Sequence, residues 1–357
     1  MRRLFLLVLA GAATLVAGQK IVGGPVAVNV TSNSATVVWV VESDQTTLRP
    51  AGAEARTAPS LHVEKTTLTG LQPNTKYEYD VGGQDGRKGS FKTPPTGAAP
   101  FQFVVFGDTR SRHDVHRRVI EAMLKHGVPD LALNTGDLVA NGNDSAMWPV
   151  FFDIEKDLLR QTAYFPALGN HERNSRDFYD IFQVTTPYYS FNWGNAHFII
   201  LNSDIGNAAT SKSARDAYWA EQTRWLEEDL EANQKADYRF LVSHYPPFSA
   251  VSNRQPENSW VAALVPMFEK YHISAGFFGH DHNYQHYLKN GVHYVTTGGG
   301  GAPLYNVNRP PADILQKVVS TEHFVTIGVD GKVARLQAIA VDGSTLDEFE
   351  IKGGAQQ

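Results

Sequence analysis

Four short apolar segments of this sequence each end in an aspartate or a histidine, and this pattern constrains the fold more than any other feature. The polar side chains stand in the motifs FGDTR (Asp108), NTGDL (Asp137), VSHYPP (His244) and FGHDH (His280 and His282). Continuous apolar runs of this length are typical of strands that are covered on both faces. Because ligands of open α/β sheets bind beyond the carboxyl ends of the strands, we expect these side chains to face one crevice.

From residue 100 onward, the predicted strands alternate with helical segments. Buried strands are predicted over 101–106, 131–134, 197–202, 238–243 and 275–278, and apolar residues recur at helical spacing in 114–125, 217–231 and 260–270. The tail over 324–351 has an alternating pattern around Asp330-Gly331 and Asp342-Gly343, which indicates hairpins. The alternation of strands and helices predicts an α/β domain.

The preceding part of the chain has a different pattern. Short alternating strands separated by turn residues are predicted over 26–30, 35–41, 61–68, 76–81 and 87–91, without helical periodicity. A Pro/Gly-rich joint over 94–100 follows. The chain of 357 residues is therefore expected to form two domains, each with its own core: a small all-β sandwich over 19–95 and a larger α/β domain over 100–357.

Residues 1–18 are similar to a cleavable export signal. Arg2 and Arg3 precede an apolar run that is about 14 residues long, short of the ~20 needed to span a bilayer, although a membrane anchor is the alternative reading. We expect an exported protein, periplasmic or secreted, with no membrane contact after signal removal. Removal would change the formal charge from −5 to −7, which argues against nucleic acid as a partner. The chain has no cysteine, so a metal site must use oxygen and nitrogen ligands.

A fifth segment, PALGNHE, adds Asn170 and His171 to the candidate site residues. A glycine directly precedes most of the candidate ligands, and glycine permits the tight turn that directs the next side chain off a strand end. Carboxylate, amide and imidazole ligands together suit Zn, Fe and Mn better than calcium. Two ions would fit this set, because one carboxylate can bridge them and the pair can stabilise both the attacking and the leaving oxygen of a displacement at phosphorus.

In the order GD, GD, GNHE, H and GHxH, these motifs resemble the metallophosphoesterase (calcineurin-like) superfamily. The upstream stretches SATVVWVV with Trp39, LTGLQPNTKYEYDV with Tyr77, and GSFKTPP are similar to fibronectin type III domains, in which a tryptophan fills the sandwich and a tyrosine forms a corner. Together the two parts resemble the purple acid phosphatase branch. The resemblance implies a four-layer α/β/β/α metallophosphoesterase sandwich preceded by a small all-β sandwich domain.

The resemblance also implies a role for each site residue. Six residues would hold two divalent or mixed-valence ions of Fe, Zn or Mn: Asp108, Asp137 and His282 the first ion, and Asn170, His244 and His280 the second, with Asp137 bridging both. His171 would stabilise the phosphoryl oxygens or protonate the leaving group. Glu172 and Asp281 would either orient ligand histidines or be ordinary surface charges.

Two positions depart from the family pattern. Many members have a histidine two residues after the first aspartate, and the purple enzymes have a tyrosine three residues after the second, where this chain has Arg110 and Ala140. Arg110 is expected to act in catalysis by binding a substrate phosphate oxygen. Two alternatives are that it points away and pairs with a carboxylate, or that it weakens the first metal site. Without the tyrosine, the protein is predicted to be colourless.

These features predict a hydrolase that acts on small phosphate esters with a metal-bound hydroxide, most simply as a phosphomonoesterase. The alternative is a phosphodiesterase acting on nucleotide or phospholipid-headgroup substrates, because the scaffold does not decide the ester type. A non-enzymatic alternative is an exported binding protein with a vestigial metal site, which would recognise a protein partner through the β-sandwich. The segments 141–163 and 205–217 are expected to be loops that shape the substrate site.

Overall fold

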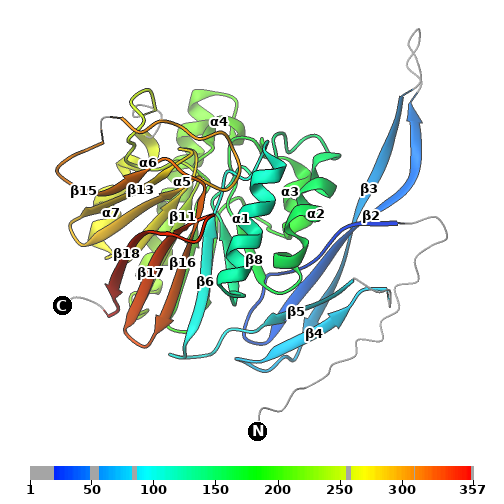
Figure 1. Ribbon diagram of the computed structural model, residues 1–357, viewed down its shortest axis with the longest axis horizontal. Helices are drawn as coiled ribbons and strands as arrows, with labels where there is room; N and C mark the ends of the chain where they lie inside the picture. Colours follow the sequence, from blue (N-terminus) through cyan, green and yellow to red (C-terminus); the bar gives the residue numbers. More distant parts are fainter. Residues whose placement is uncertain (1–19, 49–55, 83–86, 255–258, 309, 355–357) are drawn as a thin grey trace.

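The computed structural model describes all residues except 1–19, 49–55, 83–86, 255–258, 309 and 355–357 (Figure 1). The predicted export signal therefore lies outside the described residues.

Two large sheets face each other in the molecule. The first has the strand order β18-β17-β16-β6-β7-β8-β1-β2-β3, and the second has the order β15-β13-β14-β12-β11-β10-β9. The strands are β1 (Lys20–Val28), β2 (Ser34–Leu48), β3 (Arg56–Thr69), β6 (Phe101–Phe106), β7 (Leu131–Asn134), β8 (Ala163–Pro166), β9 (Tyr189–Trp193), β10 (Ala196–Ile200), β11 (Tyr238–Ser243), β12 (Ala275–Phe278), β13 (Tyr284–Lys289), β14 (Val292–Thr297), β15 (Leu315–Val319), β16 (His323–Asp330), β17 (Val333–Ala340) and β18 (Thr345–Lys352).

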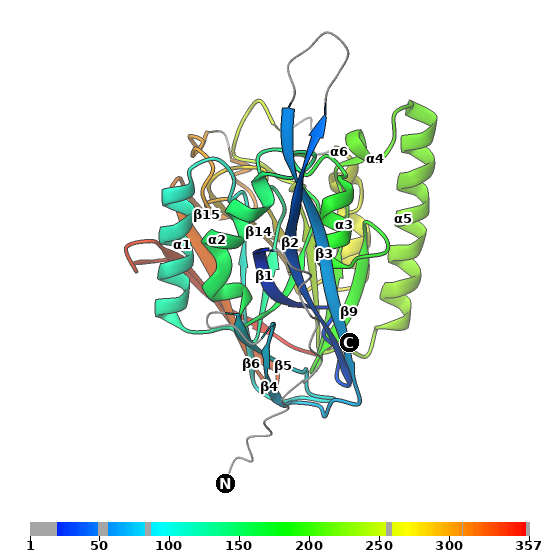
Figure 2. The same cartoon turned by 90° about the vertical axis from the view of Figure 1, so that its right-hand side faces the viewer.

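Helices cover the outer face of each sheet, on opposite sides of the molecule (Figure 2). The first sheet is covered by α1 (His113–His126), α2 (Met147–Leu159) and α3 (Arg176–Phe182). The second is covered by α4 (Ile205–Ala208), α5 (Lys212–Ala232), α6 (Ser259–Ala263) and α7 (Val265–Lys270). The predicted four-layer α/β/β/α class is confirmed.

The interior between the two sheets is built from aromatic side chains. The ring centroid of Phe103 on β6 lies 5.2 Å from that of Phe198 on β10 and 5.2 Å from that of Phe240 on β11. Alternate residues of β6, such as Val104, instead face the helices. Because the central strands are apolar on both faces, they stack rigidly and hold their carboxyl ends in register.

The N-terminal part is all-β, as predicted. It consists of the three strands β1, β2 and β3 and a separate pair, β4 (Lys76–Asp80) and β5 (Lys88–Lys92). Trp39 is buried in the same core as Tyr77 and Phe91. The hydroxyl of Tyr77 accepts a hydrogen bond from the backbone N–H of Gln72, 2.7 Å away, and this contact fits the tyrosine corner that the fibronectin resemblance implies.

The N-terminal β-sandwich packs directly against the α/β part. β1 pairs in parallel with β8 at Ala27 and Ala163, so the N-terminal strands extend the first sheet. One buried cluster contains Trp39 of the N-terminal part together with Phe103 of the α/β part. The predicted boundary near residues 95–100 remains a prediction, and the two sides of it are joined by a continuous sheet and a continuous core.

Two further expectations differ from the structure. The segment 141–163, expected to be a loop, contains α2, whose buried Trp148, Phe151 and Phe152 pack on the first sheet. The helix predicted over 260–270 is two helices separated at Leu264. Pro266 lies in the first turn of α7 and has no N–H to donate to the preceding turn, so the chain restarts there.

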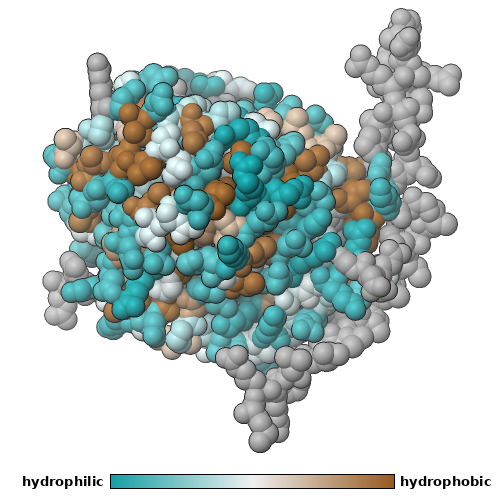
Figure 3. Space-filling model, in the orientation of Figure 1, coloured by the Kyte–Doolittle hydropathy of each residue, from teal (hydrophilic) through white to brown (hydrophobic). Residues whose placement is uncertain are grey.

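Among the described residues, no helix has both the length and the apolar character required to cross a membrane. The face of the molecule seen in Figure 3 is mostly hydrophilic, with apolar patches between the polar side chains.

Candidate metal centre

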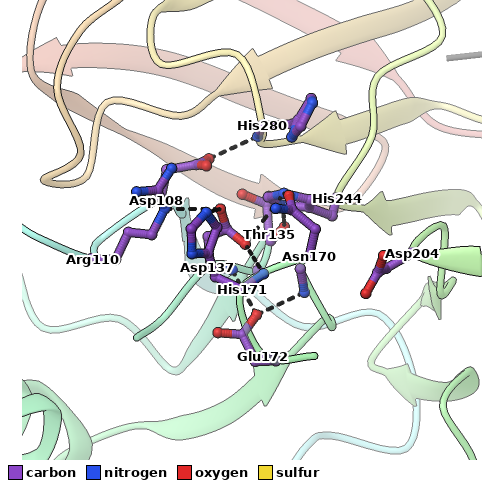
Figure 4. A network of polar contacts seen from close by, with 12 residues as sticks. Asp108, Arg110, Thr135, Asp137, Asn170, His171, Glu172, Asp204, His244 and His280 are labelled. Atoms are coloured by element: carbon purple, nitrogen blue, oxygen red, sulfur yellow. Dashed lines mark hydrogen bonds and ion pairs between the residues drawn. The ribbon is translucent and has the colours of Figure 1, made fainter. Parts of the chain in front are cut away.

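Strand ends from both sheets meet and bring the predicted site residues together (Figure 4). Asp108 follows β6, Asp137 follows β7 and Asn170 follows β8, and these three strands are parallel neighbours in the first sheet. His244 follows β11 and His280 follows β12, which are parallel neighbours in the second sheet. The carboxyl ends of parallel strands share one edge, which explains why residues far apart in the sequence converge there.

Three of these residues have a left-handed backbone, which is uncommon for residues other than glycine. The φ angles are 55° at Asp108, 58° at Asp137 and 68° at His280. Each such residue costs about 1–3 kcal/mol unless its surroundings enforce it, and such strain concentrates at functional sites. The turns direct the three side chains off their strands and toward one another.

Glu172 holds two of the ligand-bearing loops in place. Its carboxylate is fully buried and accepts hydrogen bonds from the backbone N–H groups of Asp137, Leu138 and Gly169 at 2.8 Å and from that of Val139 at 3.3 Å. Burial and the nearby negative charge of Asp137 raise the pKa of Glu172 to about 7. Neither sequence reading of Glu172 is right, because it orients the backbone beneath the ligands and not a ligand histidine, and it is not on the surface.

The donor atoms of the site form a compact group around Asp137. Ligand atoms of Asp108, Asp137 and His244 lie within 4.8 Å of one another. Asn170 adds its Oδ1 atom, 3.0 Å from Nε2 of His244, and His282 adds its Nε2 atom, 3.3 Å from Oδ1 of Asp108. The candidate ligand atoms of these five residues therefore lie close together.

The hydrogen bonds of the histidines leave lone pairs directed into the site. Nδ1 of His244 lies 2.9 Å from the carbonyl oxygen of Thr135, and Nδ1 of His282 lies 2.6 Å from that of Pro303. A carbonyl only accepts, so each Nδ1 carries a proton, and Nε2 is the atom of each ring that can present a lone pair to a metal ion.

Each of these lone pairs faces another acceptor: Oδ1 of Asn170 for His244, and Oδ1 of Asp108 for His282. That oxygen of Asp108 is buried and has no hydrogen-bond partner among the described residues. Facing acceptors repel unless a cation or an extra proton lies between them. Because carboxylate, amide and imidazole groups are also the side chains that hold Zn, Fe and Mn, the residues fit divalent metal ions.

Charge within the site shifts two pKa values in opposite directions. Burial alone would raise the pKa of Asp137, but the positive charges of His244, His171 and Arg110 outweigh it and hold this pKa below its usual value. Burial alone would lower the pKa of His244, but the carboxylates of Asp137 and Asp108 outweigh it and raise this pKa. The site thus keeps its central carboxylate ionised, as metal binding requires.

His280 is placed differently from the other predicted ligands. Its backbone N–H donates to Oδ2 of Asp108 at 2.9 Å, and its ring packs edge-on against Tyr245, with the centroids 4.2 Å apart. Its Nε2 atom contacts the guanidinium of Arg254. Burial, with the nearby positive charges of His244 and Arg254, lowers the pKa of His280, so its ring is neutral.

Arg110 points into the site. Its Nε atom donates to Oδ2 of Asp137 at 3.1 Å, and its Nη2 atom lies 3.5 Å from Nε2 of His282. Arg110 therefore pairs with a carboxylate, as one alternative predicted. It does not point away from the site, however, because this carboxylate belongs to the candidate ligand Asp137.

His171 lies at the open side of the site. Its Nδ1 atom lies 2.8 Å from the carbonyl oxygen of Ala140, which can only accept, so Nδ1 carries a proton. Its Nε2 atom lies 3.9 Å from Oδ2 of Asp137, and its side chain is 27% exposed. A substrate can therefore reach the ring.

Asp281 is buried and, among the described residues, makes no direct hydrogen bond to a ligand histidine, although its Oδ1 atom lies 3.9 Å from Nε of Arg254. Its Oδ2 atom contacts Ser249 Oγ and accepts from Nε2 of Gln285 at 2.9 Å. It therefore fixes the chain next to His280 and His282 by holding the neighbouring segments.

Sequence reasoning missed three residues around the site. Tyr305 stacks on the ring of His282 with the centroids 4.1 Å apart. The guanidinium of Arg254 lies over the same tyrosine ring, 4.6 Å from its centroid. Asp204 is buried at the far side in Figure 4, and burial raises its pKa. The sequence LNSD directly after β10 could have indicated Asp204, because it places a carboxylate just beyond a strand end. The other two residues lie in irregular segments without a motif.

The glycine run 298–301 packs closely against the turn that carries Asp108. A Cβ atom at Gly298 would lie 2.3 Å from the carbonyl oxygen of Asp281 and 2.9 Å from Oδ2 of Asp108, and one at Gly300 would lie 2.3 Å from the carbonyl oxygen of Gly107. This turn therefore packs directly behind Asp108, where larger residues would displace it.

The two-sheet fold and this donor set define a metallophosphoesterase-type scaffold. Residues 101–284 match the family model described as calcineurin-like phosphoesterase, and the chain belongs to that family.

Named relatives of the chain include acid phosphatases. The chain is 26% identical over 280 residues to a purple acid phosphatase of Glycine max, covering 70% of this chain and 58% of the relative. It is 29% identical over 201 residues to human tartrate-resistant acid phosphatase type 5, covering 48% of this chain and 61% of the relative. The chain thus spans little more than half the length of these relatives.

Among solved structures, the purple acid phosphatase PPD1 from yellow lupin (Lupinus luteus) seeds superimposes with a TM-score of 0.71 at 17% identity, covering 94% of this chain and 74% of that chain. This likeness concerns the fold. The resemblance predicted from the motifs is confirmed.

Proposed function

We propose that this protein is a metal-dependent hydrolase of phosphate esters, most simply a phosphomonoesterase. The observation that carries the proposal is the buried cluster of ligand atoms of Asp108, Asp137 and His244 within 4.8 Å of one another, with Asn170 and His282 beside it, because divalent metal ions bind such a set. The purple acid phosphatase relatives support the same reaction class. We further propose two ions of Fe, Zn or Mn, with Asp108, Asp137 and His282 on one side and Asn170, His244 and His280 on the other.

Bound metal ions supply positive charge to the phosphoryl group and lower the pKa of a coordinated water toward neutrality. Residues of the chain bind the substrate and donate the proton. Arg110 is held by Asp137 with its guanidinium facing the site, where it binds a phosphoryl oxygen of the substrate. His171 is fixed by the carbonyl of Ala140 and, when its ring is protonated, donates the Nε2 proton to the leaving alcohol.

The test is turnover by protein stripped of metal and reloaded with Zn, Mn or Fe, on 4-nitrophenyl phosphate and on bis(4-nitrophenyl) phosphate. We expect metal-dependent turnover, faster on the monoester, and loss of both turnover and bound metal in Asp137→Ala. Asp342→Ala is the matched control, because Asp342 is an exposed carboxylate in a distant hairpin. Absence of turnover with every metal would refute the enzyme and leave the binding-protein alternative, and faster diester turnover would favour the phosphodiesterase alternative.

Export from the cytoplasm, and recognition of a protein partner through the N-terminal strands, are further proposals. Export is supported by the sequence of residues 1–18 and is tested by locating the mature N-terminus in cell fractions.

A further inference from the structure

A cleft of about 360 Å³ opens beside the metal centre, between the segment that leads into α1 and the helix α2. Figure 1 shows these two helices side by side on the outer face of the first sheet. The lining of the cleft includes Arg110, Leu138, Ala140, Ala146 and Val150.

The wall of the cleft is mainly apolar. Leu138, Val139 and Ile154 are buried at its base, and Val150 on α2 is 40% exposed at its rim. The buried His116 also lines it, but Nε2 of His116 is already bound to the carboxylate of Glu155 at 2.9 Å. Arg110, Ser111 and His113 supply polar groups on the side of the segment that leads into α1, whereas on the side of α2 a charged or hydroxyl-rich group would lose hydrogen bonds to water without regaining them.

Two contacts join the cleft to the site. Arg110 lines the cleft and also donates to Asp137 at 3.1 Å, so its guanidinium lies between the cleft and the metal ligands. Ala140 lines the cleft and its carbonyl oxygen holds His171, the proposed acid for the leaving group. His171 is thus anchored to a residue of the cleft wall, which places the proposed acid close to the cleft.

We propose that this cleft binds the organic group of the substrate, and that the substrate is a phosphate ester of an apolar alcohol, aryl or short alkyl in character. The inference rests on the proposed phosphoesterase function. The volume is at the lower end of the range for small-molecule sites, about 300–1,000 Å³, which suits one ring or a short chain better than a nucleoside.

The test compares two esters whose leaving groups are both alcohols, so that their intrinsic reactivities are similar: benzyl phosphate and glycerol 3-phosphate. Metal-loaded wild-type protein is expected to show a kcat/KM at least about tenfold higher for benzyl phosphate. Val150→Asn should reduce this preference about threefold to tenfold, mainly through KM, because an apolar contact of this size contributes about 1 kcal/mol.

Val128→Asn is the matched control. Val128 is a valine with 43% exposure that lies outside the cleft, and its replacement should leave the preference unchanged. Ala146→Trp, which fills the exposed rim, should lower kcat/KM for benzyl phosphate more than for glycerol 3-phosphate. Inhibition constants of benzylphosphonate and methylphosphonate measure the same preference without turnover.

Equal turnover of the two esters, or an equal effect of Val150→Asn on both, would overturn the cleft assignment while leaving the phosphoesterase intact. If neither benzyl phosphate nor glycerol 3-phosphate were hydrolysed with any metal, the proposed phosphomonoesterase function would be overturned, and the cleft assignment with it.

Discussion

Three residues of the candidate metal centre have a strained backbone that neighbouring hydrogen bonds stabilise. Asp108, Asp137 and His280 have a left-handed backbone, and the hydrogen bonds around them enforce it: the N–H of Asp108 donates to Gly136, that of Asp137 to Glu172 and that of His280 to Asp108. Each ligand position is thus held by a neighbour, which fixes the donors before any ion binds.

Arg110 is the residue that most distinguishes this site from its family pattern. If it binds a phosphoryl oxygen, Arg110→Ala should reduce kcat/KM about 10- to 100-fold, because a charge-assisted hydrogen bond contributes about 1.5–3 kcal/mol. Arg110→Lys should be intermediate, because it keeps the charge but loses the planar fork. Steady-state kinetics measures this, with the 89% exposed Arg176→Ala as the control. An Arg110→Ala enzyme as active as the control would show that Arg110 only pairs with Asp137.

Glu172 supports the ligands from beneath. In Glu172→Gln, an amide NH₂ would face backbone N–H groups that now share a carboxylate, so we expect a loss of about 2–4 kcal/mol of unfolding free energy. Metal content should fall as well, because the turn that carries Asp137 loses its anchor. Urea unfolding and elemental analysis measure the two effects. A variant with unchanged stability and metal content would contradict this role.

Ala140 leaves the site without a tyrosine at the position used by the purple enzymes. We expect iron-loaded protein to be colourless, because tyrosinate-to-iron charge transfer needs a tyrosine ligand. A visible absorption spectrum of the ferric protein decides the point, and a strong visible band would refute it. Ala140→Tyr offers the complementary test, since it restores the ring that could produce such a band.

At the scale of elements, the ends of the strands position the candidate ligand residues. The glycine run 298–301 follows β14 and packs against the strand end at Asp108, and β16, the second strand after this run, begins at His323. The ring of His323 lies directly against this turn, because a Cβ atom at Gly299 would be 2.3 Å from its Nδ1 atom. The start of β16 is thus part of the support for the site.

His323 makes stability depend on pH. Burial lowers the pKa of His323 from 6.5 to about 4, so below pH 6.5 the unfolded chain binds a proton that the folded chain does not. Stability should be complete above about pH 6.5, fall by about 3 kcal/mol toward pH 4, and then level off with respect to this group.

Urea unfolding of metal-free protein in chelator at pH 7.5 and pH 4.5 measures the effect. His323→Gln should flatten the slope, and the exposed His113→Gln should not. An unchanged slope in His323→Gln would contradict the assignment.

At the scale of the whole molecule, the N-terminal strands are part of one continuous structure with the α/β layers. β1 pairs with β8, and the ring of Phe152 on α2 fills the space where a Cβ atom at Gly23 of β1 would be, 2.5 Å away. The core that surrounds Trp39 continues to Phe103.

We therefore expect a single cooperative unfolding transition, because separating the two parts would expose apolar surface on both. Differential scanning calorimetry with the calorimetric enthalpy compared with the van't Hoff enthalpy measures this. Two resolved transitions, one abolished by destabilising mutations near Trp39 alone, would show instead that the N-terminal strands fold independently.

The sequence by itself determined the class of the fold and the residues of the candidate site. Strands 101–106, 131–134, 238–243 and 275–278 were predicted with their observed bounds, because a strand buried on both faces must be a continuous apolar run. The motifs at their ends named the candidate ligands, because metal ligands must be particular side chains.

Only the tertiary structure decided how these pieces are joined. The pairing of β1 with β8, the burial of α2, the role of Glu172 beneath the ligands and the direction of Arg110 toward Asp137 all depend on contacts between segments distant in the chain. The cleft between the two helices depends on such contacts as well. Local periodicity records which face of a segment is buried, and it does not record which other segment buries it.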